Sequence, residues 1–181
     1  GMVVPDSGFI TFNGNNILHH WQYRSHIGYM PQIGRYPDNM TIGQVLDMMK
    51  DIRQQTQGTD EDLIDAFGIK PLYKKRMRTL SGGTRQKVSA CIAFLFNPDV
   101  LILDEPTAGL DPIASEQLKE KIILEKKKGK LVLITSHVLS ELDDLVTQVI
   151  YMQDGLLRFH KPVEEIHTDT GEKKLAKAIA H

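Results

Sequence analysis

The sequence lacks the features that would place it across a membrane, outside the cell or on a nucleic acid. Its 181 residues include 22 basic and 23 acidic side chains, and a net charge of −1 gives no electrostatic attraction to nucleic acid. The single cysteine, Cys91, cannot form an internal disulfide, which favours an intracellular, reducing setting. No apolar run is long enough to cross a bilayer and no secretory signal pattern opens the chain, so a role at a membrane is expected to need a partner.

Residues 80–111 are the most informative stretch of the sequence. Ser81 is a favourable helix N-cap, and Gly82 and Gly83 allow backbone N–H groups to approach a ligand closely. The free N–H groups and positive dipole end at the start of the predicted helix form an anion site. One face of that helix is apolar and consists of Val88, Ile92, Leu95 and Phe96. A Ser-Gly-Gly sequence by itself is most often only a turn.

The same stretch continues with a short apolar segment, residues 100–103, which is typical of a strand buried on both faces of a parallel sheet. Asp104 and Glu105 follow at its carboxyl end, where open α/β sheets bind their ligands. An Asp-Glu pair after an apolar strand is a solvated loop about as often as a metal site. The interpretation therefore depends on the order of these segments along the chain, and not on any one of them alone.

Taken together, these segments resemble the ATP-binding subunit of ABC transporters. Residues 80–87 are similar to the family's signature motif, with Thr84 where Gln is commonest. Residues 100–105 resemble the Walker B strand with its catalytic Glu, and residues 108–111 resemble the D-loop, which ends in Asp111.

Two further segments resemble parts of the same family. Residues 27–32 are similar to the Q-loop and end in Gln32, although a Pro-Gln sequence alone would be an ordinary strand-end loop. His137 follows the apolar run 131–134, which is predicted to be another buried strand, and it matches the family's switch histidine. A histidine on its own is more often a surface or packed residue, so its position after a predicted core strand decides the interpretation.

Strands that alternate with helices predict an α/β fold with a parallel sheet core of the P-loop NTPase type, a helical subdomain and a short antiparallel β part. The resemblance covers residues 1–181 as one partial ABC-type ATPase domain. Within it we expect a helical subdomain at residues 36–97, a core with Walker B and the switch histidine at residues 98–160, and a C-terminal tail at residues 161–181.

Several local elements can also be predicted. Thr41 and Gln44 fit a capping box at the start of a helix whose apolar face consists of Ile42, Val45, Leu46, Met49 and Ile52. Further helices are expected within residues 17–24, at 60–67 with Gly68 after its end, from Pro112 with Asp111 as N-cap, and at 138–146. Hairpin turns are expected at Asn13-Gly14 and at Gln153-Asp154-Gly155.

The resemblance implies ATP and Mg²⁺ as cofactors and assigns roles to the matching residues. Asp104 corresponds to the Walker B ligand of Mg²⁺, Gln32 completes the shell of the metal and the attacking water, and Glu105 is the general base. His137 contacts the γ-phosphate.

In this family two subunits enclose two ATP molecules head to tail. Ser81, Gly82 and Gly83 are therefore expected to bind the γ-phosphate of a nucleotide held by the second subunit, and Asp111 of the D-loop belongs to the same nucleotide-binding set.

The implied partners are a membrane-spanning transporter subunit and a second ATP-binding subunit, in a homodimer or a heterodimer, with no nucleic acid. The implied location is cytoplasmic and peripheral, at the inner face of the cell membrane. The helical subdomain faces the membrane subunit in this family, and the partner surface is expected near residues 36–45. A basic cluster at Lys74, Lys75, Arg76 and Arg78 is interpreted mainly as solvated surface.

One motif of the family is absent from the sequence. A P-loop has the pattern G-x-x-x-x-G-K-[ST], and the only Gly-Lys pair, Gly129-Lys130, is followed by a strand-like run. Residues 1–8 resemble family sequence that lies beyond the P-loop, so we expect an N-terminal truncation, either a cut in a longer chain or a start at Met2 after a cloning residue. The chain alone is then expected to bind Mg·ATP weakly and not to hydrolyse it.

Two other functions remain open. A non-transport ABC-type ATPase of DNA repair or translation is one, although the long coiled coil of the repair relatives and the paired domains of the translation relatives are missing here. The other is an interaction module without hydrolytic activity. Nucleotide binding by this chain distinguishes that module from a transport ATPase.

Overall fold

The structure, a computed structural model, describes residues 4–142 and 144–179. The chain divides into two compact units, Gly1–Ile134 and Thr135–His181, and each is described by itself. This division falls inside the predicted core segment 98–160, and the predicted subdomain boundaries stay predictions. Part of the predicted match at residues 1–8 lies outside the described residues. Within the described residues, no helix combines the length and the apolar character needed to cross a membrane.

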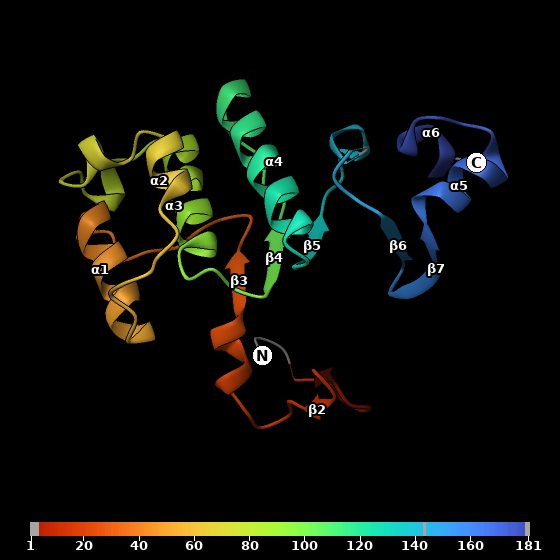
Figure 1. Cartoon of the computed structure of the whole chain (residues 1–181), viewed down its shortest axis with the longest axis horizontal. Coiled ribbons are helices and arrows are strands. Elements are labelled where there is room, and N and C mark those ends of the chain that lie inside the picture. Colours follow the sequence, from red (N-terminus) through yellow and green to blue (C-terminus); the bar gives the residue numbers. More distant parts are fainter. Residues whose placement is uncertain (1–3, 143, 180–181) are drawn as a thin grey trace. The chain divides into compact units, whose positions relative to one another are not determined.

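The core of the first unit is a three-stranded sheet in the order β3 (Ile27–Met30), β4 (Val100–Asp104) and β5 (Leu131–Thr135). Strands β3 and β4 are parallel, with Met30 opposite Leu103, and the three arrows point the same way in Figure 1. Leu101 and Leu103 are fully buried, as expected for a strand inside a parallel sheet. The predicted parallel α/β core is confirmed.

Strand β5 differs from its prediction. The sequence pattern indicated a strand buried on both faces, but Leu131 is 64% and Leu133 46% exposed. The exposed and half-buried residues alternate along the strand, so only one of its faces is covered within the described residues. An unbroken apolar run does not by itself reveal which of its two faces is covered.

Gly28 in β3 allows the strand to lie directly against the helix that follows the Ser-Gly-Gly turn. A Cβ atom at this position would lie 2.0 Å from the backbone oxygen of Ala93 and 2.8 Å from Cγ of Pro98. Real Cβ atoms do not approach backbone this closely, so a larger residue would force the strand and the helix apart.

We therefore expect Gly28→Ala to lower the free energy of unfolding by about 1–3 kcal/mol or more, as other overpacking substitutions do. Urea denaturation followed by circular dichroism measures the loss. Gly43→Ala is a matched control, because its Cβ would lie 3.5 Å from the nearest atom, the Tyr73 backbone oxygen, which is ordinary contact. An unchanged stability for Gly28→Ala would contradict this account of the packing.

The helical part of the first unit contains α1 (Ile42–Arg53), α2 (Asp62–Ala66) and α3 (Gly82–Phe94), with short 3-10 turns at Lys70–Leu72 and Met77–Thr79. The predicted capping box is confirmed: the Gln44 N–H donates to Oγ1 of Thr41 at 3.3 Å, and the Thr41 N–H donates to Oε1 of Gln44 at 2.9 Å. Gly68 follows α2 with a φ of +62°, as predicted for the residue after a helix end. The helix itself is shorter than the predicted 60–67.

Two predicted helix faces need correction. Ile52 on α1 is 68% exposed, so the buried face consists of Ile42, Val45 and Leu46 only. Helix α3 is buried around most of its circumference, including Gln86 and Ser89, and not only on the predicted apolar face. Helix α3 is buried because it packs against β3, α1 and α2. The spacing of apolar residues along a helix does not reveal packing on several sides.

Helix α1 is tied to the sheet by Arg53 in its last turn. Its Nη1 donates to the Ser25 oxygen at 2.7 Å and its Nη2 to the Ile27 oxygen at 3.0 Å, while the guanidinium lies 5.3 Å from the centre of the Phe96 ring. The helical part is thus attached to the start of β3 by hydrogen bonds as well as by apolar packing.

A charge network joins α2 to α4 (Pro112–Lys127). Lys121 Nζ lies 2.5 Å from Oδ2 of Asp60, 2.7 Å from Oδ2 of Asp62 and 3.1 Å from Oε1 of Glu125. The side chains of Lys121 and Glu125 are 4% and 0% exposed. Glu125 also pairs with Lys128 at 2.8 Å and with Lys130. Because the charges of Lys121 and Glu125 are withdrawn from water, each is stabilised mainly by the opposite charges around it.

Stability should fall at low pH because of Glu125. Burial alone would raise the pKa of this carboxyl group, but hydrogen bonds from Lys128, Lys130 and Lys121 outweigh it and lower the pKa from 4.5 to about 2. A lowered pKa stabilises the folded state above about pH 4.5, and this contribution is lost as the pH falls towards 2. Urea denaturation between these limits should show a smaller loss for Glu125→Gln than for the unmodified chain, with Glu120→Gln on the surface of α4 as control. Equal losses in all three proteins would contradict the assignment.

The antiparallel part begins with β1 (Thr11–Phe12) and β2 (Asn15–Asn16), joined by the predicted Asn13-Gly14 turn. Both turn residues have positive φ, +48° and +79°, as a tight hairpin requires. The helix predicted within 17–24 is wrong in extent: the chain forms a 3-10 helix at Gln22–His26 instead. Hydrogen bonds from Leu18 N to Oδ1 of Asn16 and from Trp21 N to Oε1 of Gln22 hold the preceding residues in a turn.

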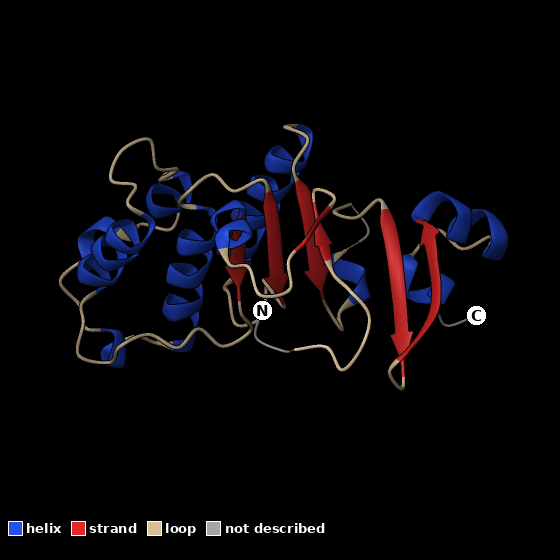
Figure 2. Cartoon of the chain, turned by 90° about the horizontal axis from the view of Figure 1, so that it is seen from below, coloured by secondary structure: helices blue, strands red, loops and turns tan. Residues whose placement is uncertain are grey.

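The second unit contains the antiparallel strands β6 (Gln148–Gln153) and β7 (Leu156–Pro162), shown in Figure 2, followed by α5 (Val163–Thr170) and α6 (Leu175–Ile179). Asp154 and Gly155 in the turn both have positive φ, which confirms the predicted hairpin. The helix predicted at 138–146 is wrong. Its described residues contain only a 3-10 turn at Leu139–Glu141, and residue 143 lies outside them. The Val138 N–H donates to Oγ of Ser136 at 3.0 Å, a local turn that competes with a helix start.

Candidate functional site

The site begins at the N-terminus of α3. Ser81 Oγ accepts a hydrogen bond from the Thr84 N–H at 3.2 Å, which confirms Ser81 as the N-cap, and it lies 2.9 Å from Oγ1 of Thr84. Ser81 and Gly82 are exposed, and a Cβ on Gly82 would meet no atom within 4 Å. The Thr84 N–H is thus capped by Ser81, while the space around Gly82, the first residue of a 13-residue helix, is open, as at a phosphate-binding helix start.

The start of α3 packs against the loop that follows β4. A Cβ on Gly83 would lie 2.7 Å from the Gly109 oxygen, so glycine is needed for this close approach. Gln86 Nε2 donates to the Glu105 oxygen at 3.5 Å. Lys87 Nζ lies 2.6 Å from Oδ2 of Asp111. These three contacts join the predicted signature motif, the Walker B end and the D-loop within one unit.

Asp111 has two roles in this packing. Its Oδ1 accepts the Ala114 N–H at 3.0 Å, which confirms the predicted N-cap of α4 with Pro112 next, and its Oδ2 pairs with Lys87. The hydrogen bond from Lys87 is the main cause that lowers the pKa of Asp111, so this carboxyl group stays ionised.

Glu105 has an unusual backbone conformation. Its φ of +48° lies in the left-handed region, which a residue with a side chain seldom adopts. The Glu105 oxygen accepts the Ala108 N–H at 3.1 Å, which closes a turn directly after β4. The backbone therefore turns sharply at the predicted general base.

Gln32 and Asp104 come from neighbouring strands. Met30 at the end of β3 lies opposite Leu103 in β4, so both chains leave the sheet at the same edge, with Gln32 exposed and Asp104 and Glu105 half-buried. No group of three metal-ligating side chains occurs in the part of the chain that the structure describes. Mg²⁺ needs only one or two carboxylates besides water and substrate phosphates, so Asp104 with the Gln32 amide suits this ion.

His137 follows β5, two residues after the strand ends at Thr135. It belongs to the second unit, while Gln32, Ser81 and Glu105 belong to the first. The assignment of His137 therefore rests on its position in the chain after a core strand, and it stays a prediction.

Sequence reasoning missed two residues of the site, Gln86 and Lys87. Both follow the signature glycines, but their contacts are with Glu105 and Asp111, which lie about twenty residues further along the chain. The only signal in the sequence is that a basic residue, Lys87, lies one helical turn after Gly83 and an acidic residue, Asp111, ends the D-loop.

A family model described as ABC transporter matches residues 1–108, more than half of the chain. This chain belongs to the ABC transporter family. The resemblance inferred from its motifs is thereby confirmed.

Relatives within the family support the same conclusion. Lipopolysaccharide export system ATP-binding protein LptB of Haemophilus influenzae is 31% identical over 184 residues, which cover 97% of this chain and 76% of LptB. The uncharacterized ABC transporter ATP-binding protein YcbN of Bacillus subtilis is 29% identical over 174 residues, 94% of this chain but only 57% of YcbN. The chain thus spans little more than half the length of YcbN.

A solved structure described as the ATP binding subunit of an ABC transporter has the same fold. It superposes with a TM-score of 0.89 over 99% of this chain and 78% of that chain, at 24% sequence identity. The predicted α/β ATPase fold is confirmed by this likeness.

Proposed function

We propose that this chain is part of an ATP-binding and ATP-hydrolysing subunit that drives transport through a separate membrane-spanning subunit. The observation that carries the proposal is the joint packing of the signature turn, the Walker B end and the D-loop through Gly83, Gln86 and Lys87. An interaction module that only dimerised would not need an acidic pair at the carboxyl end of β4 beside this turn.

The residues of the chain divide the chemistry between them. Bound Mg²⁺ would neutralise charge on the phosphates, with Asp104 and Gln32 as the side chains that hold it. Glu105 would take a proton from the attacking water, and the turn at its backbone fixes where its carboxylate can reach. His137 would contact the γ-phosphate after β5.

The turn at Ser81, Gly82 and Gly83 is proposed to contact a nucleotide that a second ATP-binding subunit holds. Ser81 and Gly82 are exposed at the start of α3, Gly83 follows them, and the same helix contacts the D-loop residue Asp111 through Lys87. A γ-phosphate bound there would be held by the subunit opposite. In this arrangement Lys87 would link the phosphate-binding turn of this chain to its own D-loop.

The membrane-spanning partner is tested by cross-linking. We expect cysteines placed at Asp38 or Asn39, both exposed and close in sequence to Gln32, to form adducts with the co-expressed membrane subunit. The native cysteine should not react with the cross-linker, because Cys91 is only 1% exposed and burial raises the pKa of its thiol. A cysteine at the exposed Lys127 of α4 is the control and should give no adduct. Absence of adducts at both test positions would contradict the proposed docking surface.

A further inference from the structure

Helix α3 contains two buried polar side chains that carry no charge. Among the described residues, four polar or charged residues are buried: Gln86, Ser89, Lys121 and Glu125. Lys121 and Glu125 pair with opposite charges, whereas Gln86 and Ser89 of α3 are neutral. A buried amide or hydroxyl group is unfavourable unless it makes a hydrogen bond. The partners of these two side chains therefore show which segments of the chain α3 binds.

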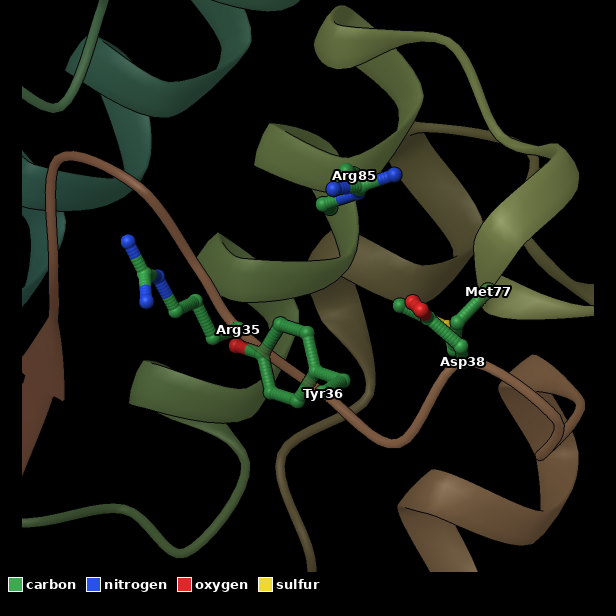
Figure 3. Close-up of a pocket in the computed structure, with 5 residues that line it drawn as sticks. All are labelled: Arg35, Tyr36, Asp38, Met77 and Arg85. Atoms are coloured by element: carbon green, nitrogen blue, oxygen red, sulfur yellow. The ribbon is translucent and has the colours of Figure 1, made fainter.

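Ser89 binds the segment after Gln32. The Tyr36 hydroxyl donates to Oγ of Ser89 at 3.1 Å, and burial raises the pKa of the Tyr36 phenol, so the phenol stays protonated. A small pocket on this side of α3 is lined by Arg35, Tyr36, Asp38, Met77 and Arg85 (Figure 3). Arg85 precedes Gln86, and consecutive residues of a helix point about 100° apart. Gln86 therefore faces a different neighbour of α3.

That neighbour is the loop after β4. The Gln86 residue is 5% exposed, and its Nε2 donates to the backbone oxygen of Glu105 at 3.5 Å. The same oxygen accepts the Ala108 N–H at 3.1 Å. The bond from Ala108 is local, whereas Gln86 lies nineteen residues before Glu105 in the sequence. The backbone of the predicted general base is thus held by its own turn and by α3.

The backbone at Glu105 depends on such hydrogen bonds. Its φ of +48° is unfavourable for a residue with a side chain and persists only where the surroundings hold it. The next residue is Pro106, which has no N–H, so the peptide group between the two can be held by hydrogen bonds only through the Glu105 oxygen. A donor at this oxygen fixes the ψ angle of Glu105 and therefore the direction of its side chain.

The amide of Gln86 comes from a surface that is itself fixed. Gly83 lies so close to the loop that a Cβ would be 2.7 Å from the Gly109 oxygen, and Lys87 Nζ lies 2.6 Å from Oδ2 of Asp111. Positions 83, 86 and 87 are three and four residues apart, so they share one side of α3. This side of the helix contacts the loop at three points, and Gln86 lies between the other two.

We propose that Gln86 is a positioning residue for Glu105: its buried amide holds the backbone oxygen of Glu105 and thereby fixes where the carboxylate meets the attacking water. The inference rests on the proposed function, in which Glu105 is the general base. Gln86 contributes no group to the reaction and acts through Glu105 alone. Misplacement of a reacting group by about 1 Å can slow an enzyme about a hundredfold, so one buried hydrogen bond can control turnover.

The first test uses the chain as it is and needs no nucleotide. Gln86→Met keeps the length of the side chain and removes the N–H donor. Amide hydrogen exchange measured by NMR should become about two- to tenfold faster at Ala108, because its acceptor is held less firmly. Arg53→Met is the matched control. It also removes side-chain hydrogen bonds to backbone oxygens, those of Ser25 and Ile27 at the start of β3, and should leave exchange at Ala108 unchanged.

The second test measures ATP turnover after the chain is joined to a P-loop. Gln86→Met should lower kcat about tenfold or more and leave KM for ATP unchanged, because ATP binding does not depend on the position of the base. Gln86→Glu should be slower still, because its carboxylate has nearly the same size but turns an acceptor towards the Glu105 oxygen. Arg53→Met should leave kcat unchanged.

A double substitution separates positioning from a general structural role. In a Glu105→Gln background, Gln86→Met should cause no further loss of kcat, because the base that Gln86 positions is already absent. A residue that only stabilised the fold would lower kcat by the same factor in both backgrounds.

Three results would overturn the proposal. They are unchanged exchange at Ala108 in Gln86→Met, a normal kcat in both Gln86 variants, and full additivity of Gln86→Met with Glu105→Gln. Near-normal turnover by Glu105→Gln alone would reject the general base, and the inference with it. Because that protein retains Gln86, failure of the proposed function is seen separately from failure of the positioning role.

Discussion

Glu105→Gln is expected to slow ATP hydrolysis by about a hundred- to ten-thousandfold once the chain is joined to a P-loop, while ATP binding is retained. The amide keeps the size of the carboxylate and one hydrogen-bond acceptor but cannot take a proton from water. Glutamine has the same side-chain length as glutamate, so the substitution should not disturb the left-handed backbone conformation at this position. Steady-state phosphate release and equilibrium nucleotide binding measure the two effects separately.

Glu120→Gln is the matched control for this prediction. Glu120 is exposed on α4, so loss of its charge should leave turnover unchanged. Near-normal turnover by Glu105→Gln would remove Glu105 from the reaction and would move the role of base to another residue near the end of β4. Loss of both binding and turnover would instead indicate that the loop after β4 had lost its structure.

Lys121→Met is expected to have the largest effect on stability, about 3–5 kcal/mol of unfolding free energy, because it leaves the buried Asp60 carboxylate without its cation and removes one of the three lysines that pair with Glu125. Asp60 has a 12% exposed side chain and Glu125 a fully buried one, and both lie within about 3 Å of the Lys121 ammonium. Methionine has a similar length and fills the space, so the loss reports the charge rather than a cavity. Urea denaturation gives the value.

The control for this substitution is Lys127→Met on the exposed side of α4, which should change stability by no more than about 0.5 kcal/mol. If Lys121→Met were as stable as the control, the network would contribute nothing net, as some buried ion pairs do. A loss of cooperativity instead of stability would indicate that Lys121 mainly holds α2 and α4 together.

Much of the local structure follows from short sequence signals. The capping box at Thr41 and Gln44, the N-caps at Ser81 and Asp111 and the Asp154-Gly155 turn were all predicted correctly. Each depends on atoms within about four residues of one another, so the neighbouring sequence contains the whole interaction.

The errors have two causes. Ile52 and strand β5 lie in correctly predicted elements but carry apolar side chains that remain exposed, because the sequence pattern does not show which face a partner covers. The helix predicted at 138–146 forms only one 3-10 turn among its described residues, because a local turn at Ser136 and Val138 competes with a helix start. Burial is decided by the partner element, which is distant in sequence.

The sequence by itself determined the family of this protein, because the signature, Walker B and D-loop motifs are continuous segments whose order is visible in the chain. Only the tertiary structure decided what those motifs contact: Lys87 with Asp111, Gly83 against Gly109, and Gln86 with the Glu105 oxygen. A sequence motif shows which side chains and backbone groups lie close together along the chain. Where those groups meet depends on how β3, β4 and α3 pack, and the packing is set by all of their buried surfaces together.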